Sequence, residues 1–188
     1  MIFLILPLIA AVLLFPYGWS VFHRYRLIQR LTAKGKQLGF SFKPLRRAVL
    51  FSHNRSTDFD FCLEGQDRIY LIKLWACYRR RTTLLVDEYG RVAVRSRYRI
   101  PIQKEESGEP IEEIVDGSFR SIPRTVMPRL ETKGRRVIPI LLNYPTYDAV
   151  LRKVGGKIAS VRNGDVLFEK KFYTPSALER AMMQDSPS

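Results

Sequence analysis

The chain has 188 residues, and its 32 Lys and Arg residues outnumber its 18 Asp and Glu residues, which gives a formal net charge of +14. This balance favours anionic partners, either lipid headgroups or nucleic acid, over cationic ones. The two cysteines, Cys62 and Cys77, are too few for a disulfide-rich scaffold or a four-cysteine zinc site, so we interpret both as buried or neutral thiols.

The first 22 residues are almost entirely apolar, and no charged side chain occurs before Arg24. A helix rises about 1.5 Å per residue, so some 20 residues cross the roughly 30 Å of bilayer hydrocarbon. Tyr17, Trp19 and Tyr25 lie at the end of the stretch, where aromatic rings prefer the boundary between lipid and water. We therefore predict that residues 1–22 are a transmembrane anchor in the cell membrane.

The distribution of charge around this anchor predicts its orientation. Eight Lys and Arg residues occur from Arg24 to Arg47, none precedes Arg24, and no acidic residue occurs before Asp58. Because positive charge near a membrane span stays on the cytoplasmic side, we expect a single-pass protein with its N-terminus outside and its domain in the cytoplasm. The alternative is a cleaved signal peptide, but the stretch lacks a basic leading region and a small-residue cleavage site.

A basic juxtamembrane helix is expected over residues 23–39. Apolar residues recur there at helical spacing between basic ones, and Gly39 is a good helix stop. In one alternative the helix continues the anchor or lies on the membrane surface, with its basic face on anionic headgroups. In the other it covers the sheet of the following domain. The sequence leaves both alternatives open.

Residues 40–183 are predicted to form one cytoplasmic α/β domain with a mixed β-sheet and flanking helices, followed by a disordered tail at 184–188. The expected strands start at residues 47–52. Two β-hairpins follow, one from 58–63 to 68–75 and the other from 82–86 to 91–95.

The second half of the domain gives further local signals. Residues 104–122 are rich in acidic residues and are predicted to be a flexible loop. The remaining expected elements are a buried strand at 137–142, a short helix at 147–153, a hairpin of 157–161 with 166–168 around Asn163-Gly164, and a helix capped by Thr174 with Pro175 in its first turn.

One group of arginines lies far from the predicted anchor and is not explained by its orientation. On the second hairpin, arginines at alternate positions share one face, which is either a solvated outer face or a binding surface for an anion. The candidate anion-binding residues are Arg79, Arg80, Arg81, Arg91, Arg95, Arg97 and Arg99.

The first hairpin resembles the nuclease-related domain (NERD), a branch of the PD-(D/E)xK nuclease-like fold. Residues 58–65 (DFDFCLEG) resemble that family's acidic strand ending in Gly, and residues 69–75 (IYLIKLW) resemble its next strand, which normally carries Glu-x-Lys. The resemblance implies a restriction-endonuclease-like fold. In an active member the Asp and Glu hold a divalent metal ion, and the Lys steadies the attacking water.

This chain departs from the active pattern at two of the three positions. Asp60 matches the Asp, but Lys73 replaces the Glu and Trp75 replaces the Lys. An ammonium stands where a hard cation would need an oxygen ligand. With a two-residue turn at Gln66-Asp67, Asp60 and Lys73 face each other across the hairpin, and we expect their ion pair to replace the metal.

We therefore expect a non-catalytic, membrane-anchored binding domain for an anionic partner (lipid headgroups or nucleic acid) or for a protein. One alternative is an active nuclease that uses Asp58, Asp60 and Lys73, with Mg²⁺ or Mn²⁺ and a relocated second acid. Two Glu-x-Lys triplets, 131–133 and 169–171, could supply that acid, but neither is expected on a strand paired with that of Asp60. The other alternative is a structural subunit of a membrane complex.

Overall fold

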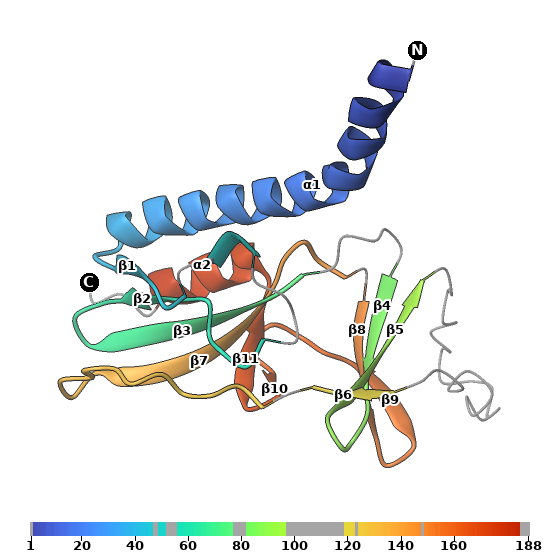
Figure 1. Ribbon diagram of the computed structural model, residues 1–188. Helices are drawn as coiled ribbons and strands as arrows, with labels where there is room; N and C mark the ends of the chain where they lie inside the picture. Colours follow the sequence, from blue (N-terminus) through green and yellow to red (C-terminus); the bar gives the residue numbers. More distant parts are fainter. Residues whose placement is uncertain are drawn as a thin grey trace.

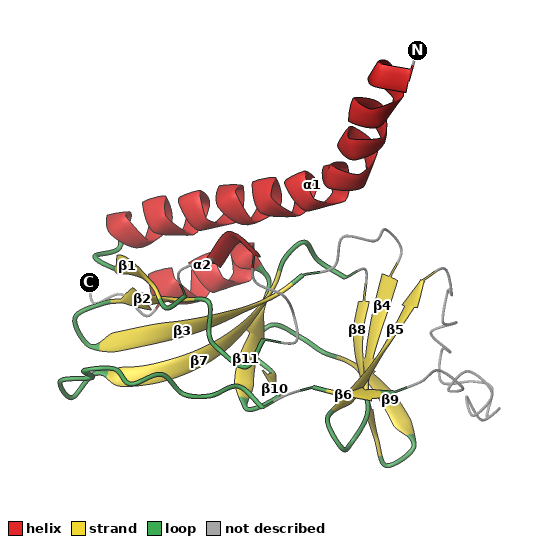
Figure 2. Cartoon of the chain, in the orientation of Figure 1, coloured by secondary structure: helices red, strands yellow, loops and turns green. Residues whose placement is uncertain are grey.

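A computed structural model gives the architecture of most of the chain (Figure 1). The described residues are 2–46, 49–51, 56–76, 82–96, 119–122, 124–147 and 149–184. For residues 2–17, 51, 95 and 96, only the backbone is described. The described residues form a mixed α/β fold with two α-helices, as the sequence predicts, but they form two β-sheets where one mixed sheet is expected (Figure 2).

The larger sheet has six strands in the order β1-β2-β3-β7-β11-β10. Their bounds are β1 Ser41–Pro44, β2 Phe61–Glu64, β3 Arg68–Trp75, β7 Arg136–Asn143, β10 Val166–Leu167 and β11 Lys170–Tyr173. Strands β1, β2 and β3 are antiparallel, whereas β7 runs parallel to both β3 and β11. The two central strands, β3 and β7, carry the long apolar runs expected of strands buried on both faces.

The smaller sheet has five strands in the order β6-β5-β4-β8-β9. Their bounds are β4 Thr82–Val86, β5 Arg91–Ser96, β6 Arg120–Ser121, β8 Ala149–Val154 and β9 Lys157–Ser160. A shared apolar core joins the two sheets, because Trp75, Leu141 and Phe172 of the larger sheet pack with Leu84 and Val150 of the smaller one.

Helices α1 (Ile2–Gln37) and α2 (Pro175–Gln184) lie on the same face of the larger sheet (Figure 2). Leu27 and Leu31 of α1 are buried there beside Leu178 of α2. On the strands, this core is lined by Phe61, Leu63, Tyr70, Ile72, Leu74, Ile138, Ile140 and Leu142. Residues 23–37 of α1 therefore cover the sheet, and they also continue the helix of residues 2–22, so the structure combines these features of both alternatives.

Helix α1 is continuous across the predicted boundary between residues 22 and 23. Its N-terminal part bends away from the domain and projects beyond it (Figure 1). Pro7 and Pro16 lie in this part of the helix, and proline is a common cause of helix bends. Side chains of α1 are described from Gly18 onward. Among the residues whose side chains are described, no helix is both long and apolar enough to cross a membrane.

Two of the three predicted hairpins are confirmed. In the first, β2 pairs with β3 in the register Phe61↔Ile72, which leaves Gln66-Asp67 as the two-residue turn. In the second, β4 pairs with β5. Helix α2 begins at Pro175 as predicted, and the Leu178 N–H donates to the Thr174 carbonyl in its first turn.

Two predicted elements are wrong. The strand expected at residues 47–52 is a 3₁₀ turn at Val49–Phe51, and the strand that pairs with β2 is β1, directly after α1. A short apolar run does not define a backbone period, so it fits a buried turn as well as a strand. The helix expected at 147–153 is strand β8, which pairs in parallel with β4.

The predicted hairpin of 157–161 with 166–168 is also wrong, because its two strands belong to different sheets. Strand β9 turns back onto β8 through Gly155-Gly156, and β10 pairs with β11. The two glycines have φ of 55° and 81°, a conformation that other residues adopt at a cost. The predicted loop at 104–122 contains strand β6 at its C-terminal end, and its residues 104–118 lie outside the described residues.

Candidate functional site

Asp60 and Lys73 face each other at the end of the first hairpin, as the sequence predicts. The Lys73 Nζ lies 3.9 Å from the Asp60 Oδ2, and both residues are buried, Asp60 completely and Lys73 to 3% exposure. The register that brings them together follows from the two-residue turn, because residues 60 and 73 are one step beyond the pair Phe61↔Ile72. An ammonium therefore occupies the position opposite Asp60.

Backbone groups hold both side chains of this pair in place. The Leu74 N–H donates to the Asp60 Oδ2 at 2.7 Å, and the Lys73 Nζ donates to the Asp58 carbonyl at 3.0 Å. The other Asp60 oxygen, Oδ1, is buried and has no hydrogen-bond partner among the described residues. The pair is thus positioned by the main chain, with one carboxylate oxygen left unsatisfied.

Charges of both signs surround Lys73. Burial lowers the pKa of Lys73 below its usual 10.5, the negative charge of Asp60 opposes that shift, and the nearby guanidinium groups of Arg46 and Arg24 lower the pKa further. Arg24 comes from α1 and is itself buried. Asp58, on the outer side, has an effect in the same direction as Asp60 but a smaller one.

The surroundings of Asp60 do not fit a divalent metal ion held by two acids. Asp58 has an exposed side chain that pairs with Arg46, with 3.7 Å between Oδ2 and Nε. Across the described residues, no three His, Cys, Asp or Glu side chains are grouped so that they could hold a metal ion. The Lys73 ammonium lies 3.9 Å from the Asp60 Oδ2 and would repel such an ion.

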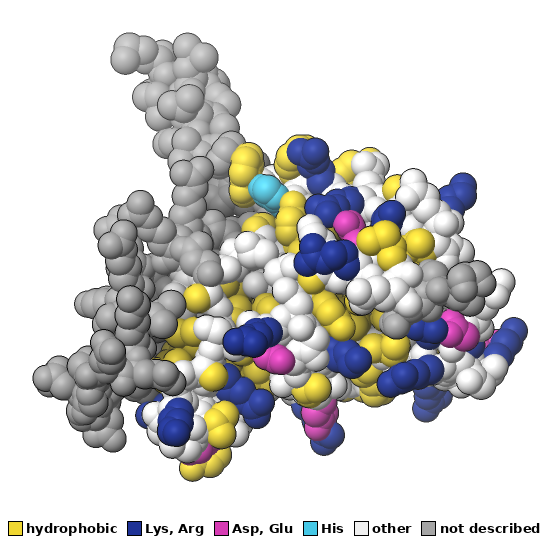
Figure 3. Space-filling model, turned by 180° about the vertical axis from the view of Figure 1, so that it is seen from behind, with side chains coloured by type: hydrophobic (Ala, Val, Ile, Leu, Met, Phe, Trp, Pro, Cys, Tyr) yellow, Lys and Arg dark blue, Asp and Glu magenta, His cyan; other side chains and the backbone are white. Residues whose placement is uncertain are grey.

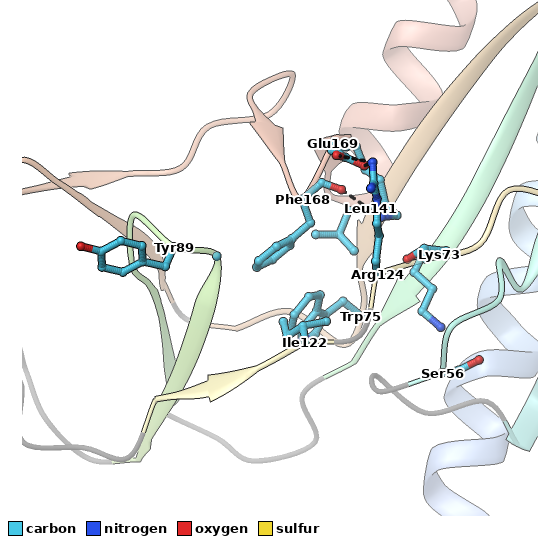
Figure 4. A pocket seen from close by; sticks show the side chains of 12 residues that line it. Ser56, Lys73, Trp75, Tyr89, Ile122, Arg124, Leu141, Phe168 and Glu169 are labelled. Carbon is cyan, nitrogen blue, oxygen red and sulfur yellow. Dashed lines mark hydrogen bonds and ion pairs between the residues drawn. The ribbon is translucent and has the colours of Figure 1, made fainter.

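A pocket of about 300 Å³ opens beside Lys73, where the two sheets meet (Figure 4). Lys73 and Trp75 of β3 lie on one of its walls, and Phe168 and Lys170 lie on another. The remaining lining residues are Ser56, Tyr89, Gly90, Ile122, Arg124, Thr125, Leu141 and Glu169. Strand β7 lies between β3 and β11, so the two lysines reach the pocket from either side of Leu141.

Lys170 is the second buried lysine of this pocket. It is only 7% exposed, and its Nζ donates to the Phe168 carbonyl at 2.9 Å. Burial lowers its pKa below the usual 10.5, the negative charge of Glu169 opposes that shift, and the positive charges of Lys73 and Arg124 add to it. Lys170 and Lys73 line the same pocket, and the charge of Lys73 is one of the causes of the lowered Lys170 pKa.

The turn between β10 and β11 has an unusual backbone. Phe168 and Glu169 are the two residues of this turn, and their φ angles are 52° and 62°. Two-residue hairpin turns of this kind normally use Asn-Gly or Gly-Gly, because other side chains are strained at positive φ. Such strain is often found where a side chain must be held in a functional position.

Aromatic rings form the apolar wall of the pocket. The rings of Trp75 and Phe168 stack with their centroids 5.3 Å apart, and the Trp75 Nε1 donates to the Tyr147 hydroxyl at 3.0 Å. Figure 4 shows Trp75, Ile122, Leu141 and Phe168 grouped together, with Lys73 and Ser56 at one end. Trp75 thus lines the pocket as a hydrophobic side chain.

The predicted anion-binding arginines are only partly described. Arg91 lies on β5, where its Nε donates to the Asp87 Oδ2 at 2.7 Å and its guanidinium lies over the Tyr89 ring. For Arg95, on the same strand, only the backbone is described, while Arg79, Arg80, Arg81, Arg97 and Arg99 lie outside the described residues. Seen from behind, the basic side chains of the described part are spread over the surface and interspersed with a few acidic ones (Figure 3).

The pocket includes residues that sequence reasoning did not assign. Lys170 and Glu169 belong to one of the two Glu-x-Lys triplets, and their strand pairs with β7, which is consistent with the prediction that it does not pair with that of Asp60. They reach the same pocket as Lys73 across β7. No sequence pattern pointed to Arg124, because it lies on an irregular segment.

Cys62 is buried, as predicted, and burial raises the pKa of its thiol to about 12, whereas Cys77 lies outside the described residues.

Comparison of the chain with protein-family models, with curated proteins and with solved structures finds no match.

Proposed function

We propose that this protein is a single-pass membrane-anchored, nuclease-like domain that does not cleave nucleic acid and that binds an anionic partner at the inner face of the cell membrane. The observation that carries the proposal is the buried pair of Asp60 and Lys73. In the resembled nuclease family, a metal-binding acid occupies the position of Lys73. A buried ammonium at that position opposes the charge that the chemistry requires.

The order of elements supports a restriction-endonuclease-like fold for this domain. A helix precedes three antiparallel strands, β1 to β3, and the buried strand β7 then pairs in parallel with β3. The acidic strand and the strand that follows it are adjacent, and they hold Asp60 and Lys73 at equivalent depth. This is the arrangement that the sequence resemblance implies.

The N-terminal part of α1 supports the proposed anchor. Residues 1–22 contain no charged side chain, and the helix that they begin projects beyond the domain (Figure 1). Trp19, Phe22 and Tyr25 are about half exposed on the outer surface of α1, as is expected of aromatic side chains at a lipid–water boundary. The basic residues that follow favour a cytoplasmic location for the domain.

The cationic groups of the site support binding of an anion. Lys73 and Lys170 are buried at one pocket, and Arg124 lies at its edge. The formal net charge of +14 adds a long-range attraction for any anionic partner.

The experiment that tests the proposal is a cleavage assay on the full chain, kept in a non-ionic detergent, with single-stranded and double-stranded DNA and RNA in the presence of Mg²⁺ or Mn²⁺. We expect no cleavage by the wild-type chain. Metal-dependent cleavage that disappears in Asp60→Asn would overturn the proposal, since Asn keeps the shape of the side chain and removes its charge.

An active nuclease would need a second acid, and Glu169 is the carboxylate that lines the pocket with Lys73. Its side chain is exposed and pairs with Arg124 at 2.9 Å, so a metal ion could replace Arg124 as the partner of this carboxylate. The variant Glu169→Gln therefore belongs in the same assay. Cleavage lost in both Asp60→Asn and Glu169→Gln would identify the protein as a metal-dependent nuclease with a relocated acid.

A further inference from the structure

The pocket beside Lys73 carries more positive than negative charge. Among the described residues that line it, three are cationic, Lys73, Lys170 and Arg124, and one, Glu169, carries a carboxylate. Asp60 compensates Lys73 from outside the pocket lining, and Glu169 pairs with Arg124. Lys170 is then the cation whose charge has no ion pair with any described carboxylate.

The contacts of Lys170 leave its ammonium able to bind a ligand. An ammonium has three N–H donors, and the structure assigns one of them to the Phe168 carbonyl. The group also lies 5.7 Å from the centroid of the Phe59 ring, a contact that stabilises a cation without neutralising it. Because a buried charge is costly unless it is paired, an anion in the pocket would stabilise Lys170 and reduce its repulsion from Lys73.

The hydroxyl groups at the pocket favour an anion with several oxygen atoms. Ser56 and Thr125 line the pocket with the cations, and the Ser56 side chain is held by the Arg46 Nη1, which donates to its Oγ at 2.6 Å. A phosphate monoester carries about 1.5 to 2 negative charges at neutral pH and offers three strong acceptor oxygens. It therefore matches two ammonium groups and two hydroxyls better than a carboxylate does.

The stacked rings of Trp75 and Phe168 give the pocket a flat apolar wall, which Leu141 and Ile122 extend. Ring-shaped ligands stack on such walls. The strained backbone of the Phe168-Glu169 turn fixes both the Phe168 ring, which belongs to this wall, and the Phe168 carbonyl, which orients Lys170. One turn thus positions the apolar and the cationic parts of the pocket together.

The pocket is small. Its volume of about 300 Å³ lies at the lower end of the range for small-molecule sites. It accommodates one small molecule and is too small for a nucleic-acid duplex, whose binding would require an extended basic surface.

We propose that this pocket binds a phosphate monoester of a small aromatic molecule, with the phosphate between Lys73 and Lys170 and the ring against Trp75 and Phe168. This inference rests on the proposed anion-binding function and assigns its site and its class of ligand.

The test is isothermal titration calorimetry of the full chain in a non-ionic detergent, with phenyl phosphate as the probe. Inorganic phosphate and phenol are titrated separately, to report the anionic and the aromatic part alone. We expect phenyl phosphate to bind at least about tenfold more tightly than either part, because both walls of the pocket then contribute. Equal affinity for inorganic phosphate and phenyl phosphate would overturn the assignment of an aromatic ligand.

Two methionine variants locate the site. Lys170→Met removes the buried charge and keeps an unbranched apolar side chain, and we expect it to weaken phenyl phosphate binding about tenfold or more. Lys171→Met is the matched control, because Lys171 is the next residue of β11, carries the same charge and is exposed. If Lys170→Met binds as tightly as the wild type, or if both variants weaken binding equally, the ligand does not occupy this pocket and the inference is wrong.

A short single-stranded DNA, titrated into the same variants, separates the inference from the function on which it rests. Salt-dependent DNA binding that Lys170→Met leaves unchanged, with no phenyl phosphate binding, would refute the pocket assignment and leave anion binding by the domain intact. If neither phenyl phosphate nor DNA binds, the inference and the anion-binding part of the proposed function fail together.

Discussion

Replacing Asp60 with Asn should destabilise the domain by an amount that the geometry of the buried pair sets. The Asp60 carboxylate is completely buried, accepts the Leu74 N–H at 2.7 Å and lies 3.9 Å from the Lys73 ammonium. Asn preserves the size of the side chain and one oxygen that can accept the Leu74 N–H. The variant therefore removes the negative charge and little else.

The magnitude follows from the distance between the two charges. At 3.9 Å and an effective dielectric constant of about 20, the attraction is about 4 kcal/mol. Breaking a buried pair by removing one partner generally costs about 3–5 kcal/mol, because the other charge stays buried without compensation. We expect Asp60→Asn to lower the free energy of unfolding by about 3 kcal/mol.

Urea denaturation of the full chain in a non-ionic detergent, followed by tryptophan fluorescence, measures this loss. The urea concentration at the midpoint of unfolding should fall, while the dependence of the unfolding free energy on urea concentration (the m-value) should not change. Lys73→Met should cost a similar amount when introduced alone. In the double variant both charges are absent, so we expect a stability within about 1 kcal/mol of the wild type.

Additivity would refute this reasoning. If Asp60→Asn costs less than about 1 kcal/mol, and the double variant loses the sum of the two single losses, then Asp60 and Lys73 do not interact as a buried ion pair. The matched control is Lys171→Met, which removes an exposed charge and should change stability by less than about 0.5 kcal/mol.

Three further substitutions test other parts of the structure by the same measurement. Lys170→Met should stabilise the domain by on the order of 1 kcal/mol at neutral pH, because it removes a buried charge. Burial lowers the pKa of Lys170 below the 10.5 of the unfolded chain, so between these two pKa values the unfolded chain binds more protons and the wild type gains stability with rising pH. The stability advantage of Lys170→Met should therefore shrink as the pH rises through that window. An advantage that is constant with pH would contradict this. Glu169→Gly should raise the free energy of unfolding by about 0.5–1 kcal/mol, because glycine relieves the strain at φ 62°. Glu131→Gly is the control and should not raise it, because Glu131 is exposed and does not have a positive φ. Gly65→Ala should cost about 1–3 kcal/mol, because its Cβ would lie 2.6 Å from the Phe40 ring, and an unchanged midpoint would show that the ring can move aside.

The features that could be predicted from the sequence are those with local causes. The two-residue turn at Gln66-Asp67 fixes the register of the first hairpin, and that register alone places Asp60 opposite Lys73. The start of α2 was equally predictable, because Thr174 and Pro175 are a local capping signal.

The failures occur where distant partners decide the backbone. Residues 147–153 are predicted to be helical, but pairing with β4 makes Ala149–Val154 a strand. Asn163-Gly164 is a strong turn signal, yet the strands on either side pair with β8 and β11 rather than with each other. No short-range pattern shows that one chain segment will pass from one sheet to the other.

The pocket could not be predicted for the same reason. Its walls come from β3, from the turn before β11 and from the irregular segment that contains Arg124, and these meet only after both sheets have formed. Lys170 lies in a Glu-x-Lys triplet, but its burial depends on the sheet. Its role as a buried cation is visible only in the folded chain.

The most direct test of the central claim, that the Lys73 ammonium replaces a metal ion at Asp60, is a Mn²⁺ titration of the full chain followed by electron paramagnetic resonance. We predict that the wild-type chain takes up no Mn²⁺ at micromolar concentration, and that Lys73→Glu, which sets a second carboxylate opposite Asp60, gains binding. Micromolar Mn²⁺ binding by the wild-type chain that is lost in Asp60→Asn would contradict the account.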